Sequence, residues 1–223
     1  MISAVRRRLQ RGHAEGDAGL TLVELMVSLI VFSLFLTILL SAVIGITRAS
    51  SRAQLLSRSS SNVLIVFQNL DRQIRYANAI NFPGAGPSGS RYIEFRTGAE
   101  SAPTGVVTCT QWRYNPAAAA IQTRTWPDVV GASPTPWVTK ISDVTDLGTP
   151  DYPFKMIPAA IGASSMQQMA ISVSSGTPLV TPGAAISTNL VARNSSIQSP
   201  SNSNVIVAGV SDTPVCLSSG SRP

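Results

Sequence analysis

Hydrophobic and polar residues are unevenly distributed along the chain. Residues 25–47 contain no charged side chain and consist mostly of Leu, Ile, Val and Phe. As an α-helix this stretch would be about 35 Å long, which exceeds the roughly 30 Å hydrocarbon core of a bilayer. The apolar part of a cleaved secretory signal has only about 7–15 residues. We therefore predict a membrane-spanning helix that is retained in the mature protein.

The helical pattern continues beyond this apolar stretch. Neither proline nor glycine occurs between residues 46 and 82, and apolar residues recur there at steps of seven, four, three and four. These residues are Leu56, Val63, Phe67, Leu70 and Ile74. We expect one helix to about Tyr76, with a transmembrane or filament-core part over residues 20–47 and an amphipathic extension over residues 48–79.

From residue 80 the pattern changes to period two, with β-branched and aromatic residues between Pro, Gly, Ser and Asn. Residues 106–114 and 119–126 predict a hairpin that turns at Asn115 and Pro116. Further strands are expected at 91–96, 137–141, 169–174, 190–193 and 205–210. The predicted fold class is α+β: a long N-terminal transmembrane helix continues into an amphipathic helix, which packs on an antiparallel β-sheet head at residues 80–223.

A short basic segment precedes the apolar helix. Four arginines lie within residues 1–19, and by the positive-inside rule they place the N-terminus in the cytoplasm and the head outside. Arg48 and Arg52, on the far side of the helix, weaken this signal. They do not reverse it, because a folded head translocates largely regardless of its charge.

Glu24 is a carboxylate just inside the apolar helix, five residues after Gly19. A charged residue at mid-bilayer costs about 2.5–3.5 kcal/mol on insertion scales, so an intramembrane carboxylate is a candidate for function. In the alternative interpretation, Glu24 is solvated near the headgroups or stabilises the first turn through the helix dipole.

The string GLTLVE at residues 19–24, followed by an unbroken apolar helix, resembles the type III signal of prepilins and pseudopilins. These are the subunits of type IV pili and type II secretion systems. The resemblance implies that a prepilin peptidase removes a leader of residues 1–19 by cutting between Gly19 and Leu20, and methylates the amino group of Leu20. It also implies that Glu24 acts in assembly by pairing with the N-terminal ammonium of a neighbouring subunit.

This sequence departs from the family pattern at two points. The mature chain would begin with leucine, where phenylalanine or methionine is commoner, and its first helix lacks the proline often found at the kink position. The stretches at residues 70–80 and 109–126 resemble minor pilins and pseudopilins of the PilW and type II J classes. That second resemblance is mainly architectural, and it implies the lollipop shape of pilin-like proteins.

The net charge of +6 and the isoelectric point near 10.0 suggest a nucleic-acid partner. The surplus, however, is concentrated before the head: residues 1–19 contribute +2 and residues 20–79 contribute +3. From residue 80 onward, eight basic and seven acidic side chains leave +1. A large basic face on the head is therefore not supported, although local segregation of charge leaves nucleic-acid binding open.

Cys109 and Cys216 both lie beyond the apolar helix, in the part expected in an extracytoplasmic compartment where disulfides persist. A disulfide between them would close a long loop of the chain and stabilise the folded state by roughly 4–5 kcal/mol in the loop-entropy model. The alternative is two buried thiols that act as small apolar side chains.

The sequence offers little for catalysis or cofactor binding. Gly84, Gly86 and Gly89 spell G-x-G-x-x-G, but the dinucleotide fingerprint needs a preceding strand and a following helix, and here the order is reversed. The sole histidine, His13, lies in the leader, which removes the usual triads and His-based metal sites. We assign no catalytic residue, no cofactor and no metal ligand, and we predict that the chain is not an enzyme.

Three aspartates are the one acidic cluster that could bind calcium. Asp143, Asp146 and Asp151 fall within nine residues. Aspartates in loops rich in proline and glycine are more often turn formers, so calcium binding stays an open alternative.

The leading hypothesis is a structural minor pilin or pseudopilin subunit of a type IV pilus, competence pseudopilus or type II secretion system. Its expected partners are a prepilin peptidase, other pilin or pseudopilin subunits, the membrane and an inner-membrane assembly platform. The protein would be single-pass, with a cytoplasmic N-terminus and an extracytoplasmic head, and extractable into a surface filament. The alternatives are an anchored binding protein, such as an adhesin or DNA-receptor tip subunit, and a surface enzyme with the helix as its anchor.

Overall fold

The structure is a computed structural model and describes residues 21–146, 152–176, 184–217 and 222–223. The chain divides into two compact units, Met1–Ser51 and Arg52–Pro223. The described part of the first unit is helical apart from Thr21, and the second unit contains the last turns of the same helix together with every described strand.

The helix α2 (Leu22–Arg75) has 54 residues and ends one residue before Tyr76, close to the predicted end. Glu24 lies in its first turn, and Arg72 and Arg75 lie in its last. An acid near the N-terminus and bases near the C-terminus both interact favourably with the helix dipole. Terminal charge and apolar periodicity therefore favour the same long helix.

Four of the five hydroxyl side chains in residues 25–47 form hydrogen bonds within the helix. The hydroxyl groups of four residues donate to backbone carbonyls three or four positions earlier, at 2.8–2.9 Å. These residues are Ser33, Thr37, Ser41 and Thr47. Such bonds let hydroxyl groups occupy an apolar environment without water. By length and composition α2 can cross a membrane, and it is the one such helix among the described residues.

The second unit contains two antiparallel sheets rather than the single sheet expected. The first has the order β1-β3-β4-β5-β6 with β2 also paired to β3, and the second has the order β7-β8-β9. Their bounds are β1 (Ala77–Ile80), β2 (Gly84–Ala85), β3 (Arg91–Thr97), β4 (Thr108–Asn115), β5 (Ala120–Pro127), β6 (Val138–Ile141), β7 (Phe154–Ile157), β8 (Gln168–Ser175) and β9 (Ala184–Val191). A short 3-10 helix, η1 (Pro200–Asn202), follows them.

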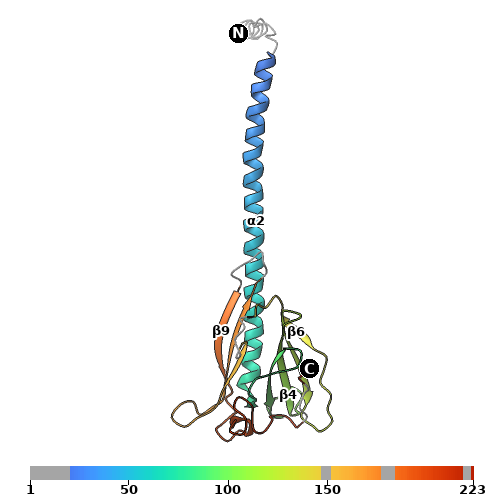
Figure 1. Cartoon of the computed structure of the whole chain (residues 1–223), viewed down its shortest axis with the longest axis vertical. Helices are drawn as coiled ribbons and strands as arrows, with labels where there is room; N and C mark the ends of the chain where they lie inside the picture. The colour runs from blue at the N-terminus through green and yellow to red at the C-terminus, as the bar shows by residue number, and fades with distance from the viewer. Residues whose placement is uncertain (1–20, 147–151, 177–183, 218–221) are drawn as a thin grey trace, which may run out of the picture. The chain divides into compact units, whose positions relative to one another are not determined.

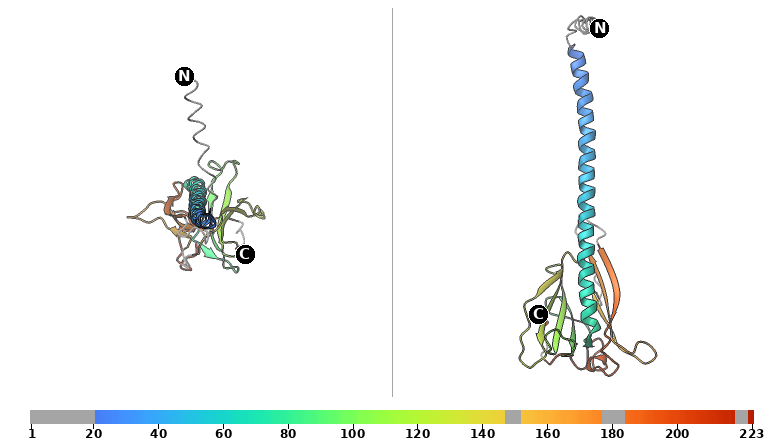
Figure 2. Two further views of the ribbon diagram at one scale, coloured as in Figure 1. Left: turned by 90° about the horizontal axis from the view of Figure 1, so that it is seen from above. Right: turned by 180° about the vertical axis from the view of Figure 1, so that it is seen from behind.

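The last turns of α2 lie between the two sheets (Figures 1 and 2). The main core joins all three elements: Leu70 and Ile74 of α2, Ile93 and Trp112 of the first sheet, and Met169 of the second are buried together. This explains why apolar residues recur at helical spacing in the otherwise polar half of α2: they form the stripe that packs against the two sheets.

The predicted hairpin is present as β4 and β5. Residues 108 to 115 pair in register with residues 127 to 120, and the Asn115 side-chain oxygen accepts the N–H groups of Ala117 and Ala118 at the turn. Asparagine side chains favour turns for this reason. Strands β3, β6 and β8 also lie where strands were predicted.

Two strand predictions need correction. Strand β9 spans Ala184–Val191, so the predicted strand at 190–193 overlaps only its end. Residues 205–210 form an exposed loop with a single bridge between Val207 and Val210. The Asp212 carboxylate accepts the backbone N–H groups of Val205 and Ile206, at 3.0 and 2.8 Å, and thereby occupies groups that a strand would use for pairing.

Candidate functional site

The predicted cleavage site at Gly19 and Leu20 lies outside the described residues, which begin at Thr21. The described geometry begins just after this predicted site, where Glu24 lies in the first turn of α2.

Thr21 and Glu24 have the spacing of a capping box, in which a Ser or Thr N-cap is followed three residues later by Glu or Gln. One of the two expected bonds is present: the Glu24 backbone N–H donates to Thr21 Oγ1 at 3.2 Å. Among the described residues, no cation pairs with the Glu24 carboxylate, and the residue is exposed. Thr21 was not predicted as the N-cap of this helix, although the T-x-x-E spacing would have indicated it.

The surface around Glu24 is apolar. Every leucine, isoleucine, valine and phenylalanine from Leu22 to Ile46 is exposed, with Leu22 at 76% and Ile38 at 70%. Exposing apolar area to water costs about 25 cal/mol per Å². A surface of this length is therefore stable only when lipid or other apolar helices cover it.

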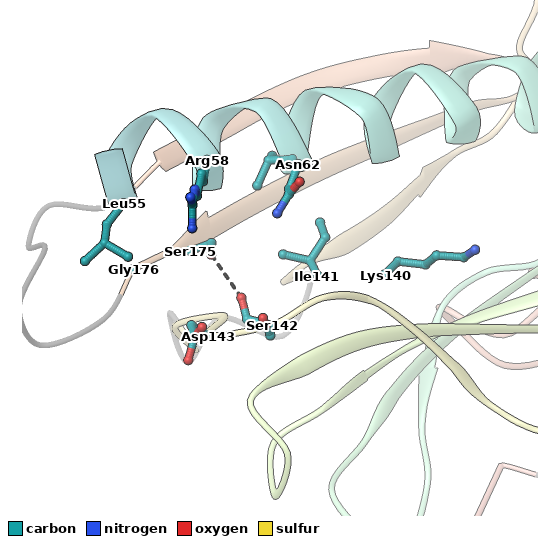
Figure 3. Close-up of a pocket in the computed structure, with 10 residues that line it drawn as sticks. Leu55, Arg58, Asn62, Lys140, Ile141, Ser142, Asp143, Ser175 and Gly176 are labelled. Atoms are coloured by element: carbon teal, nitrogen blue, oxygen red, sulfur yellow. Dashed lines mark hydrogen bonds between the residues drawn. The ribbon is translucent and has the colours of Figure 1, made fainter. Parts of the chain in front are cut away.

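The head contains a cavity of about 230 Å³ beside α2, lined by Arg58 and by residues 140–143 and 175–176 (Figure 3). In Figure 3 the Arg58 side chain points toward Ser175, whereas the Lys140 side chain points away from the cavity. Ser175 Oγ donates to the Ser142 carbonyl at 3.0 Å. The charged groups do not converge on one point, so this cavity has no arrangement of an acid, a base and a nucleophile.

Two of the three aspartates that were considered for calcium lie in the described residues, and each has a protein partner. Asp146 accepts hydrogen bonds from the Arg91 guanidinium, with its Oδ1 at 2.9 Å from Nη1. Asp143 has a positive φ of 55° and accepts the Gly176 N–H on its carbonyl at 2.9 Å, as a turn residue does. Asp151 lies outside the described residues. The Asp146 carboxylate is therefore engaged by an arginine, and Asp143 forms a turn through its backbone.

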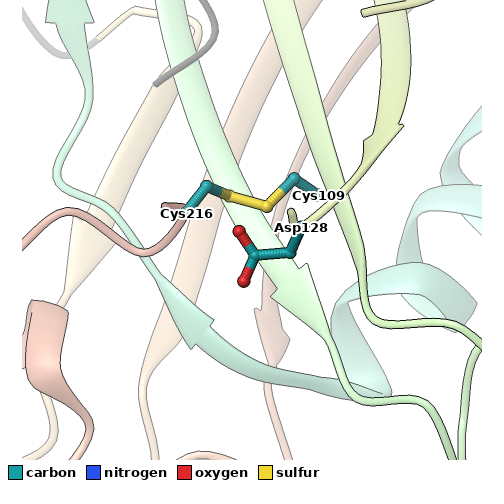
Figure 4. A group of neighbouring side chains, drawn as sticks. All are labelled: Cys109, Asp128 and Cys216. Atoms are coloured by element: carbon teal, nitrogen blue, oxygen red, sulfur yellow. A yellow bond between two sulfur atoms is a disulfide. The ribbon is translucent and has the colours of Figure 1, made fainter. Parts of the chain in front are cut away.

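Cys109 and Cys216 are joined by a disulfide, with Cα atoms 6.3 Å apart (Figure 4). Asp128 lies beside them, and its ligand oxygen and the two sulfur atoms are within 4.8 Å of one another. A disulfide offers no thiolate to a metal. The Asp128 carboxylate is also occupied, since it accepts Arg96 Nε at 2.6 Å and the Leu217 N–H at 2.7 Å. This buried cluster fastens the C-terminal segment to the sheet.

A second buried carboxylate, Glu94, fastens the same segment further along. It accepts Gln111 Nε2 at 2.7 Å, and it accepts Arg222 through Nε at 3.0 Å and Nη2 at 2.6 Å. A Cβ atom on Gly84 or Gly86 would collide with Arg222. Gly84 and Gly86 of the rejected fingerprint thus permit close chain packing, and Gly89 adopts a positive φ of 74°, so no ligand is needed to explain the three glycines.

Residues 16–40 match the family model of the prokaryotic N-terminal methylation motif. The match contains Gly19, Leu20 and Glu24, and it confirms the prediction of a type IV prepilin-like signal. No curated protein and no solved structure matches the chain. The motif and the long apolar helix together fit a single-pass, membrane-anchored protein.

Proposed function

We propose that this chain, a type IV pilin-like or pseudopilin protein, is a structural minor subunit that assembles into a filament or pseudopilus through α2. The observation that carries the proposal is the methylation motif at residues 16–40, which opens a helix with exposed side chains throughout residues 21–55. The motif indicates a structural protein whose processing involves a prepilin peptidase and whose assembly involves other pilins.

Processing would create the group that assembly needs. Cleavage between Gly19 and Leu20 releases an amino group four residues before Glu24, and methylation keeps this amine basic. A carboxylate and an ammonium are each costly in an apolar interior, but a pair between neighbouring subunits offsets most of that cost. Apolar packing alone tolerates sliding along a helix, whereas a single charge pair specifies one register.

The head would lie outside the cytoplasm. The disulfide between Cys109 and Cys216 supports this orientation, because disulfides persist in oxidising compartments and are rare in the cytosol. The basic leader supports the same orientation through the positive-inside rule. The helix would then leave the membrane when the subunit enters the filament.

A minor role is favoured over a major one by the irregular head. The second unit contains two separate sheets and several long loops, among them residues 98–107 and 128–137. A major subunit repeats many times along a filament, so irregular loops would have to fit against identical neighbours at every position. Quantitative mass spectrometry of sheared filaments should find this chain at a small fraction of the main subunit.

The N-terminal peptide of the purified protein tests the proposal. We expect its mass to correspond to N-methyl-Leu20, and the unprocessed chain to accumulate when the peptidase is deleted. An intact Met1 terminus, or a cut beyond Thr47, would contradict the proposal. Replacing Gly19 should block the cut, whereas a replacement within residues 1–10 that keeps the arginines should not.

A further inference from the structure

The head carries a second cavity, of about 500 Å³, at the C-terminal end of α2. Ligand pockets usually have volumes of about 300–1,000 Å³ and combine apolar walls with a few converging polar groups. Its walls are Gln73 of α2, Tyr76 directly after the helix, and the loop at residues 101–104, and its floor comes from strands β3, β4 and β5. All of these residues belong to the second unit.

The floor of this cavity is made of threonines. Thr97 pairs in register with Thr108, and Thr110 pairs with Thr125, so the four residues lie on one face of three adjacent strands. On β4 the same face continues with Trp112, which belongs to the apolar core. Valine has nearly the shape of threonine, so packing alone does not require hydroxyl groups here. The change from core residues to threonines indicates a surface that forms hydrogen bonds.

The walls are held in place by contacts that leave polar groups for a ligand. Trp112 Nε1 donates to Gln73 Oε1 at 3.3 Å, which fixes the amide and leaves its N–H₂ donors. Asn194 Nδ2 donates to the Tyr76 carbonyl at 3.3 Å and to Ser101 Oγ at 3.4 Å, and so connects the two walls. The cavity is therefore preformed, which lowers the cost of binding.

The chemistry of the lining restricts the ligand. Tyr76 is 47% exposed and offers an aromatic face. The Thr108 hydroxyl donates to the Val106 carbonyl at 2.8 Å and can only accept from a ligand, while hydroxyl groups such as those of the other floor threonines can donate and accept. Among the described lining residues Arg72 is the one charged side chain, and its Nη2 donates to Asn69 Oδ1 at 2.6 Å. A ligand with an apolar ring face and a rim of hydroxyl groups matches this set better than an ionic ligand does.

We propose that this cavity binds a saccharide unit, with Tyr76 stacked on the apolar face of the sugar ring and the threonines and Gln73 bonded to its hydroxyl groups. The site is separate from the assembly surface at Glu24 and does not depend on filament formation. It would give the head a binding activity for glycans in addition to its structural role.

The test uses the full chain purified in a detergent with a phosphocholine headgroup, because sugar-based detergents would compete. The probes are the methyl glycosides of glucose, galactose and N-acetylglucosamine, titrated into the tens of millimolar range and followed by saturation-transfer difference NMR. N-acetyl-trialanine amide serves as the peptide probe. We expect saturable binding of at least one glycoside and none of the peptide.

Two variants locate the site. Tyr76→Ala removes the stacking face and should weaken binding by about tenfold or more. Thr125→Val keeps the shape but removes one hydroxyl group, and should weaken binding about 2- to 10-fold. Thr188→Val makes the same change on β9, outside the cavity, and should leave binding unchanged. Because Thr125→Val preserves volume, it keeps the test valid if Tyr76→Ala fails to fold.

Three results would overturn the proposal. In the first, no glycoside binds the unmodified chain. In the second, a glycoside binds both variants as tightly as the unmodified chain, so that the site lies elsewhere. In the third, the peptide binds and the glycosides do not, which would make the cavity a contact for another polypeptide.

Discussion

Removal of the disulfide is the perturbation whose effect can be worked out most directly. Cys109 and Cys216 are separated by 107 residues. In the chain-entropy model a closed loop of this length stabilises the folded state by about 4.8 kcal/mol, because it restricts the unfolded chain. The double variant Cys109→Ala, Cys216→Ala should lose most of this amount, and alanine avoids burying a new polar group at sites that are 0% and 6% exposed.

Denaturant titration of the purified chain measures this loss. Trp112 and Trp126 are nearly fully buried in the head, so tryptophan fluorescence follows unfolding of the head. The midpoint should fall, and the slope m should rise because a chain without the bridge expands further on unfolding. Unmodified protein with reductant should reproduce the double variant, and each single variant should lose a similar amount of stability.

A loss below about 1 kcal/mol would refute this reasoning. It would mean that the unfolded head is already compact, so that the bridge removes little entropy, or that the C-terminal segment stays in place through its other contacts. The variant Glu94→Gln separates these two explanations. If Arg222 holds the segment in place, this substitution should destabilise the double variant much more than it destabilises the bridged protein.

Three further predictions concern single residues. Glu24→Gln should be processed and inserted normally but should fail to enter filaments, and normal amounts of it in sheared filaments would contradict the proposed charge pair. Thr21→Ala should still assemble, but its helix should be less stable by about 1 kcal/mol, which circular dichroism measures. Leu70→Ala should cost the head about 2–5 kcal/mol in the same titration because Leu70 is fully buried; a loss within 0.5 kcal/mol, about that of a surface substitution, would contradict the assigned core. A hydrogen bond from Ser203, with further bonds from backbone N–H groups, lowers the pKa of Asp212. The ionised Asp212 carboxylate should therefore hold its loop in place above about pH 4, the ordinary pKa of an aspartate. These contacts should be lost as the pH falls through the lowered pKa. An ordinary pKa for Asp212 in a carboxyl NMR titration would contradict the loop contacts.

Sequence patterns predicted those elements whose signal lies within one stretch of chain. The helix end near Tyr76 followed from the apolar steps up to Ile74, and the β4–β5 hairpin followed from alternation on both sides of Asn115. Strands β1 and β7 were not predicted: each has only four residues, ANAI and FKMI, and neither has the β-branched Val and Thr that mark the equally short β6. Strand β8 pairs with β7 and β9, its neighbours in sequence, so the division into two sheets lies between β6 and β7. No local pattern of alternation records whether two successive strands pair.

The loop at residues 205–210 shows how a side chain just outside a segment can override its local propensity. Three β-branched residues, Val205 to Val207, favour a strand, but a neighbouring strand must supply the hydrogen bonds for it. The Asp212 carboxylate supplies two of them instead, and the chain turns back through Gly209 at a φ of +78°. The exposed valines are thus a consequence of backbone bonding to one carboxylate.

The capping geometry sharpens the argument for charge at Glu24. A capping box is completed as well by glutamine as by glutamate, because its second bond needs only a side-chain acceptor. Glutamine would avoid the cost of a carboxylate in the membrane, about 2.5–3.5 kcal/mol at its centre and less near its edge. The helix dipole favours an acid in this turn by only about 0.3–1 kcal/mol. Capping, the Thr21 contact and the dipole therefore explain a polar residue at this position better than they explain a charged one. The proposed function explains the charge, because cleavage before Leu20 would supply an amine of the required charge on every neighbouring subunit.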